Sequence, residues 1–465
     1  MDQQQQKKYV YWEWRTIIAL MIAYALYYFV RKNFSVAVPA MEAELGISKA
    51  KLGAFMTANG IIYGVSRFIN GILADRFSKK KLMAAGLALS AIVNLVICFS
   101  PALGKIFNML DGEGKATLGL VYLIGSLWVL NGYLQGMGVP PCLSILAHWV
   151  KPSELATKQS IWNTSHSFGA GLVVFLCGFL LQKFGYSAWY LCFAVPAILS
   201  LLGLPVILFG LKDSPASVGL PPVEKMEKKN DVTGTDSVTE QLNLKGDAFK
   251  KYLNKMVFAN PYIWIISIFN FCVYVIRFTI LDWGATFLTQ YKGMEISAAA
   301  GIVGSSELFG GVLGMIVAGW ISDKVFKSKA HRTCLVFDLL ATFTFFLFWK
   351  SGNLTVSVIL LLVSSFFIYG PQALTGACIS QQATKHATGT ANGIAGIFGY
   401  ASTAISGILF GFLADSVWGW DSVFLVSIAF GIVGAILIAT MWNAPATGYA
   451  RSERVIAEIN AKSQD

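Results

Sequence analysis

The chain has 465 residues, of which 55% are hydrophobic and only 13% are charged, whereas about a quarter of the residues of a soluble domain are charged. The mean hydropathy is +0.60, and apolar runs of about 20 residues, long enough to cross a bilayer as helices, recur along the whole sequence. These properties exclude a soluble protein and also a membrane β-barrel, whose strands are shorter and alternate in polarity. They predict an all-α integral membrane protein.

The apolar runs predict twelve membrane spans. Between the sixth and the seventh lies a polar, Lys/Glu-rich segment, residues 212–258, which predicts a flexible linker carrying one surface helix. The predicted domains are therefore an N-terminal six-helix bundle (1–211), the linker, and a C-terminal six-helix bundle with a tail (259–465). In chain order the spans are residues 16–38, 53–74, 82–100, 118–147, 157–182, 188–211, 259–286, 298–322, 333–350, 356–384, 389–414 and 420–443.

The basic residues predict the topology. The N-terminal segment, the linker, the tail and the loops on the same side hold 25 of the 36 Lys and Arg, while the loops of the opposite side hold seven. The positive-inside rule therefore predicts that both termini and the linker are cytoplasmic. This distribution accounts for most of the net charge of +11, so no nucleic-acid partner is predicted. We expect a monomer in the bilayer of a bacterial cytoplasmic (inner) membrane.

The cysteines and the catalytic residue types give no sign of an enzyme or a cofactor. All seven cysteines lie within or beside apolar runs, and none has CxxC spacing. This pattern argues against a disulfide framework and against a metal site. The sequence also lacks a recognisable nucleophile with an oriented base or a metal cluster. We therefore predict no catalytic residue, no cofactor and no metal.

The two halves repeat each other. "GILADRFSKK" (71–80) and "GWISDKVFKS" (319–328) share the pattern G-x-x-x-D-[RK]-x-x-K, and their glycines are 248 residues apart. Arg31 precedes the first motif by 40 residues and Arg277 precedes the second by 42. A duplicated six-span unit is typical of transporters whose substrate site lies between two halves. The expected gating residues are Gly71, Asp75, Arg76, Gly319, Asp323 and Lys324, since glycine permits close helix approach and the aspartate can bind cations or helix termini.

Ionisable residues inside the spans predict an anion site. They comprise four cations and two carboxylates, an excess of about two positive charges: Arg31, Lys32, Arg67, Arg277, Asp282 and Glu307. Charges inside a membrane require partners, and a phosphate group carries roughly −1.5 to −2 charges at neutral pH. Because the guanidinium fork suits phosphate oxygens, the repeat-related Arg31 and Arg277 are the expected clamp, one from each half.

The neighbours of this clamp have separate expected roles. Lys32 cannot face the same way as Arg31, since adjacent helix positions lie about 100° apart, so it is expected to pair with Asp282 or Glu307. Arg67 would raise the local potential and attract anions. His166 could donate to phosphate, although a helix histidine more often satisfies a local hydrogen bond. Tyr28 and Tyr274 lie one turn before an arginine on its face.

Two glycine- and proline-containing stretches are expected to break their helices beside the cavity. They are "NGYLQGMGVPPC" (131–142) in the fourth span and "FFIYGPQALTG" (366–376) in the tenth. Such breaks in membrane helices usually line a cavity or form a hinge.

Several stretches together resemble the organophosphate:phosphate antiporter family of the major facilitator superfamily. The resemblance spans nearly the whole chain, and it implies the major facilitator fold, with twelve transmembrane helices in two pseudo-symmetric bundles. It also implies that Arg31 and Arg277 bind phosphate with help from His166, and that Lys32, Asp282 and Glu307 form an ion-pair cluster. Further implied pocket residues are Gln135, Trp162, Asn163, Tyr274 and Tyr369. The similar stretches are "YALYYFVRKNF", "LQGMGVPPC", "SIWNTSHSFGAG", "VYVIRFTILDW", "GWISDKVFKS", "IYGPQALTG" and "GTANGIAGIFGY".

The resemblance leaves the organic substrate open. The family usually has lysine where Arg67 stands, and some hexose-phosphate members carry Asp and Lys where Asn392 and Ala395 stand here. "RFTILDW", "VRKNF" and "GTANG" look more like glycerol-3-phosphate members. We therefore expect exchange of sn-glycerol-3-phosphate for inorganic phosphate by alternating access, with hexose 6-phosphate as the alternative substrate. A transporter-like sensor of external sugar phosphate is the alternative function.

Overall fold

The computed structural model describes residues 3–223 and 246–461, and within these ranges the chain folds into helices with no strand. Eleven of the described segments are long and apolar enough to cross a bilayer, which confirms the predicted all-α membrane protein. The second predicted span is not among these eleven segments. It lies in helix α2 (Lys49–Arg76), which packs within the first bundle against α5. The Lys/Glu-rich middle of the predicted linker, residues 224–245, lies outside the described residues.

The helices form two groups along the chain. The first group is α1 (Gln3–Leu45), α2, α3 (Lys79–Cys98), α4 (Ser100–Ile106), α5 (Leu118–Gln135), α6 (Val139–Trp149), α7 (Leu155–Asn163), α8 (Ser165–Phe184) and α9 (Leu191–Leu202). The second group is α10 (Gly246–Leu253), α11 (Pro261–Phe278), α12 (Gly284–Gln290), α13 (Ile296–Ser305), α14 (Val312–Lys324), α15 (Ala330–Lys350), α16 (Leu354–Ala383), α17 (Thr388–Ala404), α18 (Phe410–Asp415), α19 (Gly419–Ala439) and α20 (Tyr449–Ala461).

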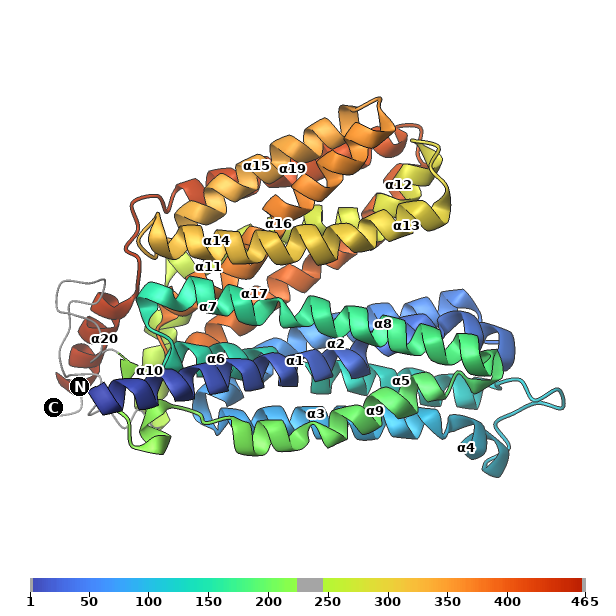
Figure 1. Ribbon diagram of the computed structural model, residues 1–465, viewed down its shortest axis with the longest axis horizontal. Coiled ribbons are helices and arrows are strands. Elements are labelled where there is room, and N and C mark those ends of the chain that lie inside the picture. The colour runs from blue at the N-terminus through green and yellow to red at the C-terminus, as the bar shows by residue number, and fades with distance from the viewer. Residues whose placement is uncertain (1–2, 224–245, 462–465) are drawn as a thin grey trace.

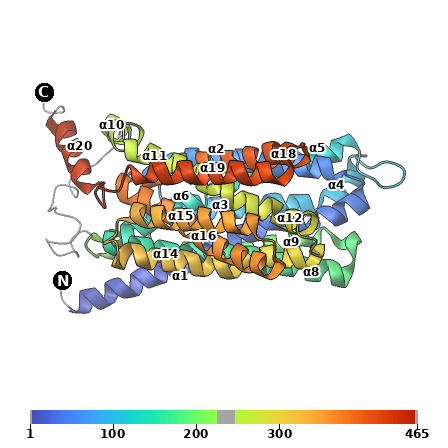
Figure 2. The same cartoon turned by 90° about the horizontal axis from the view of Figure 1, so that it is seen from above.

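The two groups form two bundles that lie against each other (Figure 1). Helix α2 packs against α17, α7 packs against α14 and α16, and α6 packs against α17, so several pairs of helices join the halves. The first and last described residues lie at the same end of the bundles, together with α10 and α20, as the two views in Figures 1 and 2 agree. We call this end the terminal end and the other the distal end.

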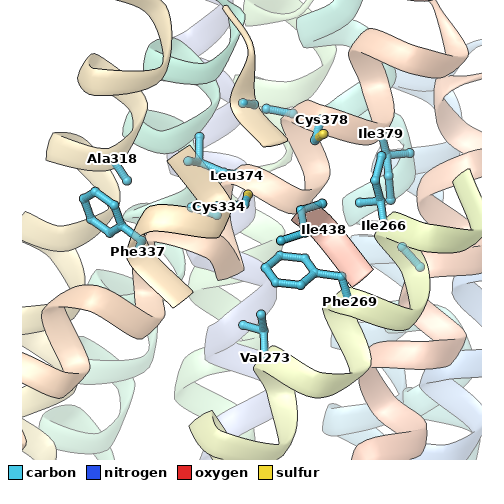
Figure 3. Packing of buried hydrophobic residues seen from close by; sticks show 14 of the residues in the cluster. Ile266, Phe269, Val273, Ala318, Cys334, Phe337, Leu374, Cys378, Ile379 and Ile438 are labelled. Carbon is cyan, nitrogen blue, oxygen red and sulfur yellow. The ribbon is translucent and has the colours of Figure 1, made fainter. Parts of the chain in front are cut away.

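The core of the second bundle is built from apolar side chains of most of its helices, including α11, α15, α16 and α19. Phe269 on α11, Cys334 on α15, Leu374 on α16 and Ile438 on α19 are all buried, and Figure 3 shows them gathered between their helices. In lipid, close packing holds helices together more than burial from water does. Cys334 contributes here as a small apolar side chain, and all seven cysteines are free.

Helix α1 is kinked one residue before the predicted clamp. Val30 has non-helical dihedral angles (φ −98°, ψ 16°) inside the helix. Its carbonyl oxygen accepts hydrogen bonds from the side-chain amides of Asn94 (3.3 Å) and Asn131 (2.9 Å) on neighbouring helices. Inserted side-chain hydrogen bonds are a usual cause of kinks. The kink lies directly before Arg31 and Lys32, so it sets the direction in which both cations leave the helix.

One of the two predicted helix breaks is present. The fourth span ends as α5 at Gln135 and resumes as α6 at Val139, as the glycines and prolines there predict. The predicted break at residues 366–376 is wrong, because α16 runs without interruption from Leu354 to Ala383 with Pro371 inside it. A proline removes only one backbone donor, and membrane helices tolerate this when the surrounding helices and side chains support them.

Candidate functional site

Two connected cavities lie between the bundles. The outer cavity, about 1230 Å³, is lined by Arg31, Lys32, Asp282 and Glu307 among others. The inner chamber is lined by Arg67 and a group of polar side chains on α7, α11, α16 and α17. Five residues line both cavities and so form the boundary between them: Tyr28, Tyr63, His166, Arg277 and Tyr400. Arg31 and Arg277, which the sequence repeat relates to each other, therefore both line the outer cavity.

Arg31 is held by a side chain and two rings of its own half. Its Nε donates to Gln135 Oε1 (3.0 Å), and its guanidinium carbon lies 4.1 Å from the centre of the Tyr63 ring and 4.8 Å from that of Tyr28. Gln135 in turn donates to Ser90 Oγ at 2.7 Å. Gln135 is fully buried, so it positions Arg31 from behind and does not line either cavity. The Arg31 Nη2 atom has no hydrogen-bond partner among the described residues.

Arg277 has an equivalent setting in the second half. Its guanidinium carbon lies 5.3 Å from the Tyr274 ring centre and 5.0 Å from that of Tyr369, and Nη2 lies 3.4 Å from Glu307 Oε1. Arg277 Nε and the Tyr369 hydroxyl have no hydrogen-bond partner among the described residues. Each clamp arginine therefore keeps unsatisfied donor atoms while aromatic rings fix its plane.

Lys32 makes no direct ion pair with Asp282 or Glu307 in this structure, so their expected pairing stays a prediction. All three residues line the outer cavity, but Glu307 pairs with Arg277, and Asp282 Oδ2 accepts a hydrogen bond from Ser406 Oγ (2.6 Å). No carboxylate of the described residues lies within ion-pair distance of Lys32. Asp282 and Glu307 both belong to π-helical turns, Thr279–Trp283 and Ser306–Gly311, which turn side chains away from the positions that a regular helix gives them.

The remaining predicted residues lie around the boundary and the inner chamber. His166, Trp162 and Asn163 line the inner chamber, as does Tyr274. His166 Nδ1 donates to the Asn163 carbonyl oxygen, so the neutral ring presents the lone pair of Nε2 and could donate to an anion only when protonated. Arg67 has an Nε atom without a hydrogen-bond partner among the described residues.

The sequence reading missed two tyrosines of the boundary. Tyr63 and Tyr400 come from opposite halves, and their rings meet edge to face with centres 4.7 Å apart. Tyr63 lies four residues before Arg67, and Tyr28 and Tyr274 lie three residues before their arginines, so each tyrosine is about one helical turn from its arginine. That spacing could have identified Tyr63. No comparable signal identifies Tyr400, whose contact depends on how the halves meet.

The two repeated motifs join the halves at the terminal end. Asp75 accepts hydrogen bonds from the backbone N–H groups of Gly389 (2.8 Å) and Thr390 (2.7 Å), at the N-terminus of α17 in the other half. Asp323 accepts one from the Thr157 N–H (2.7 Å), near the start of α7. A carboxylate at a helix N-terminus is favoured by the unpaired N–H groups and the helix dipole. These contacts therefore hold the halves together on the far side of the inner chamber.

The motif glycines make this closure possible. A Cβ atom added at Gly71 would lie 2.3 Å from the Gly389 carbonyl oxygen, and one added at Gly319 would lie 2.8 Å from that of Ala156. Both are closer than real Cβ contacts. Only glycine allows the helices to approach to this distance. Arg76 and Lys324 follow the aspartates, and the Arg76 guanidinium lies 5.2 Å from the ring centre of Phe249 on α10.

Comparison with known proteins agrees with this architecture. A model of the Major Facilitator Superfamily matches residues 20–407. The chain belongs to this superfamily. Among solved superfamily members, the proton:xylose symporter XylE bound to 6-bromo-6-deoxy-D-glucose is similar with a TM-score of 0.70 and 14% identity, covering 96% of this chain and 99% of that one. This likeness confirms the predicted fold.

Two curated superfamily relatives are closer in sequence. A probable hexose phosphate transport protein of Chlamydia pneumoniae is 34% identical over 451 residues, 94% of this chain and 93% of that protein. The glycerol-3-phosphate transporter of Bacillus subtilis is 34% identical over 432 residues, 92% of each chain. The resemblance to organophosphate carriers predicted from the motifs is thereby confirmed. The protein is a multi-pass membrane protein.

Proposed function

We propose that this protein exchanges an organophosphate for inorganic phosphate at one site between Arg31 and Arg277. The observation that carries the proposal is that the two arginines, one from each half, line one cavity with unsatisfied donor atoms. Phosphate oxygens match the guanidinium fork, and such charge-assisted hydrogen bonds are stronger than neutral ones. The names of the two relatives support an organophosphate as the second substrate.

The mechanism that fits this arrangement is alternating access. The distribution of Lys and Arg makes the terminal end cytoplasmic, so the outer cavity opens away from the cytoplasm of an inner-membrane monomer while the motif contacts close the other side. Two guanidinium groups repel each other across an empty site. An anion that bridges them draws the halves together at the distal end and favours release of the contacts at Asp75 and Asp323. Return without an anion is slow, which makes exchange obligatory.

The organic substrate is an organophosphate whose phosphate is recognised in the same way as inorganic phosphate. The sequence motifs favour sn-glycerol-3-phosphate, and hexose 6-phosphate is the alternative. Because both substrates share the phosphate clamp, each should compete with phosphate for entry. Phosphate leaving the cytoplasm can then drive organophosphate uptake.

Exchange can be tested with purified protein in lipid vesicles. Vesicles preloaded with phosphate should take up labelled phosphate and labelled organophosphate, whereas vesicles without internal anion should take up neither. Equal uptake with and without internal phosphate would contradict obligatory exchange. Binding of organophosphate without any flux would instead favour a sensor of external sugar phosphate. Release of free phosphate from the organophosphate would contradict transport and favour hydrolysis.

A further inference from the structure

The inner chamber is lined by many amide and hydroxyl groups, and the proposed phosphate clamp does not use them. Besides five tyrosines, its amide and hydroxyl residues come from both halves: Gln159 and Asn163 on α7, Asn270 on α11, Gln372 and Thr375 on α16, and Asn392 on α17. The residues that line it include no carboxylate. Side chains of this kind carry no net charge, and they can both donate and accept hydrogen bonds.

Two of these amides are already occupied within the protein. Asn270 donates to the Ala395 carbonyl oxygen (2.9 Å) and accepts from the Thr375 hydroxyl (3.0 Å). Asn392 donates to Ser380 Oγ (3.1 Å) and to the Thr388 carbonyl oxygen (3.0 Å). These bonds fix Asn270 and Asn392 as parts of the wall.

The other three amides have spare hydrogen-bonding capacity. Gln159 is 1% exposed, and its Oε1 has no hydrogen-bond partner among the described residues. Asn163 Nδ2 donates to Met315 Sδ (3.2 Å) and reaches Gln372 Oε1 across the two halves at 3.4 Å, and Gln372 Nε2 reaches the Tyr274 hydroxyl at 3.4 Å. Both 3.4 Å distances are at the long limit of hydrogen bonding. The indole N–H of Trp162, beside them, also has no partner among the described residues.

These groups are arranged to meet a ligand with several hydroxyls. Each amide offers two donors and one acceptor oxygen, and a hydroxyl can donate and accept at once. An apolar ligand would leave the buried amides unpaired, at a cost of about 1–3 kcal/mol each. A ligand with a second anionic group would depend on Arg67, the one arginine of the chamber lining that does not also line the outer cavity. A sugar carries more hydroxyls than glycerol, so it can form hydrogen bonds with more of the chamber's amide groups.

We propose that Gln159, Asn163 and Gln372 recognise the hydroxyls of a sugar phosphate whose phosphate lies on Arg31 and Arg277. This assignment rests on the proposed function and names its substrate class. The organic end of the substrate points into the inner chamber, toward the terminal end. The protein therefore prefers a hexose phosphate to glycerol-3-phosphate, the substrate that the sequence motifs favour.

The test is competition against labelled phosphate exchange in vesicles. Unlabelled glucose 6-phosphate, glycerol-3-phosphate, 3-phosphoglycerate and phosphate are titrated, and each half-inhibitory concentration is divided by that of phosphate. In the wild-type protein, glucose 6-phosphate should have the lowest ratio of the three organophosphates. Gln372→Leu should raise its ratio about 10- to 100-fold, since a site built to bind polar groups discriminates strongly when one is removed, and should change the glycerol-3-phosphate ratio less.

A conservative variant and a matched control make the result specific. Gln372→Asn keeps an amide and should restore part of the preference. Gln382 lies on the same helix but donates to the Pro445 carbonyl oxygen (2.8 Å), and it does not line the chamber, so Gln382→Leu should leave every ratio unchanged. Stronger competition by glycerol-3-phosphate or 3-phosphoglycerate, or an unaltered ratio in Gln372→Leu, would overturn the assignment while phosphate exchange stands. Absence of any phosphate exchange would overturn the proposed function as well.

Discussion

Replacing Arg31 or Arg277 by lysine is expected to lower phosphate exchange by about 100-fold or more while leaving membrane insertion intact. Lysine keeps the charge but loses the planar fork that can bind two phosphate oxygens. A hydrogen bond to a charged group contributes about 1.5–3 kcal/mol, and about 1.4 kcal/mol corresponds to a tenfold change in rate. Loss of one or two such bonds in the bridged state gives the expected decrease. The measurement is the initial rate of labelled phosphate uptake by phosphate-loaded vesicles.

Arg332 offers the matched control. It lies on α15 outside the cavities, where Nε donates to the Trp442 carbonyl oxygen (2.9 Å). Arg332→Lys should exchange phosphate at the wild-type rate. If Arg31→Lys or Arg277→Lys also exchanged at that rate, bidentate binding of phosphate by the pair would be ruled out.

Replacing Gly71 by alanine is expected to reduce exchange by about 10- to 100-fold because the terminal end can no longer close. The added methyl group would lie 2.3 Å from the Gly389 carbonyl oxygen, about 1 Å less than a normal carbon–oxygen contact. Separating α2 from α17 by that amount lengthens the bonds from Asp75 to Gly389 and Thr390, which at 2.7–2.8 Å have no slack. Loss of these charge-assisted bonds shifts the population toward the state open to the cytoplasm.

The shift can be measured as chemical accessibility. A cysteine introduced at Leu143, which lines the inner chamber, should react faster with a membrane-impermeant maleimide from the terminal side in Gly71→Ala. Gly53 lies on the same helix, and a Cβ atom there would meet nothing within 4 Å. Gly53→Ala should therefore match the wild-type protein in both rate and labelling. Equal labelling in Gly71→Ala and wild type would argue against a closure that depends on this glycine.

The sequence predicted the motifs that repeat between the halves and the charged residues inside the spans, which are costly to place in a membrane. Arg31 and Arg277 could be related through the spacing of the glycine motifs, and their convergence on one cavity follows from the two-fold repeat. The three-residue gap between α5 and α6 follows from local glycine and proline chemistry. These features depend only on residue types and on their spacing along the chain, and both can be read from one sequence.

Pairings between side chains were harder to predict because they depend on helix direction. Lys32 was expected to pair with Asp282 or Glu307, but in this structure the kink at Val30 and the π-helical turn around Glu307 place that carboxylate beside Arg277. The contact of Tyr63 with Tyr400 depends on which end of the two bundles is closed. Which chamber amides find partners is decided only when α7, α11, α16 and α17 are packed together: Asn270 makes two hydrogen bonds, whereas Gln159 Oε1 has no partner among the described residues.

The most direct test of the central claim is the binding of inorganic phosphate to the purified protein, measured calorimetrically. The wild-type protein should bind one phosphate per chain, and an organophosphate should displace it from the same site. The double variant Arg31→Lys with Arg277→Lys should fold and insert but bind phosphate at least about 100-fold more weakly. Wild-type affinity in the double variant, or an organophosphate that binds together with phosphate, would contradict a single site between the two arginines.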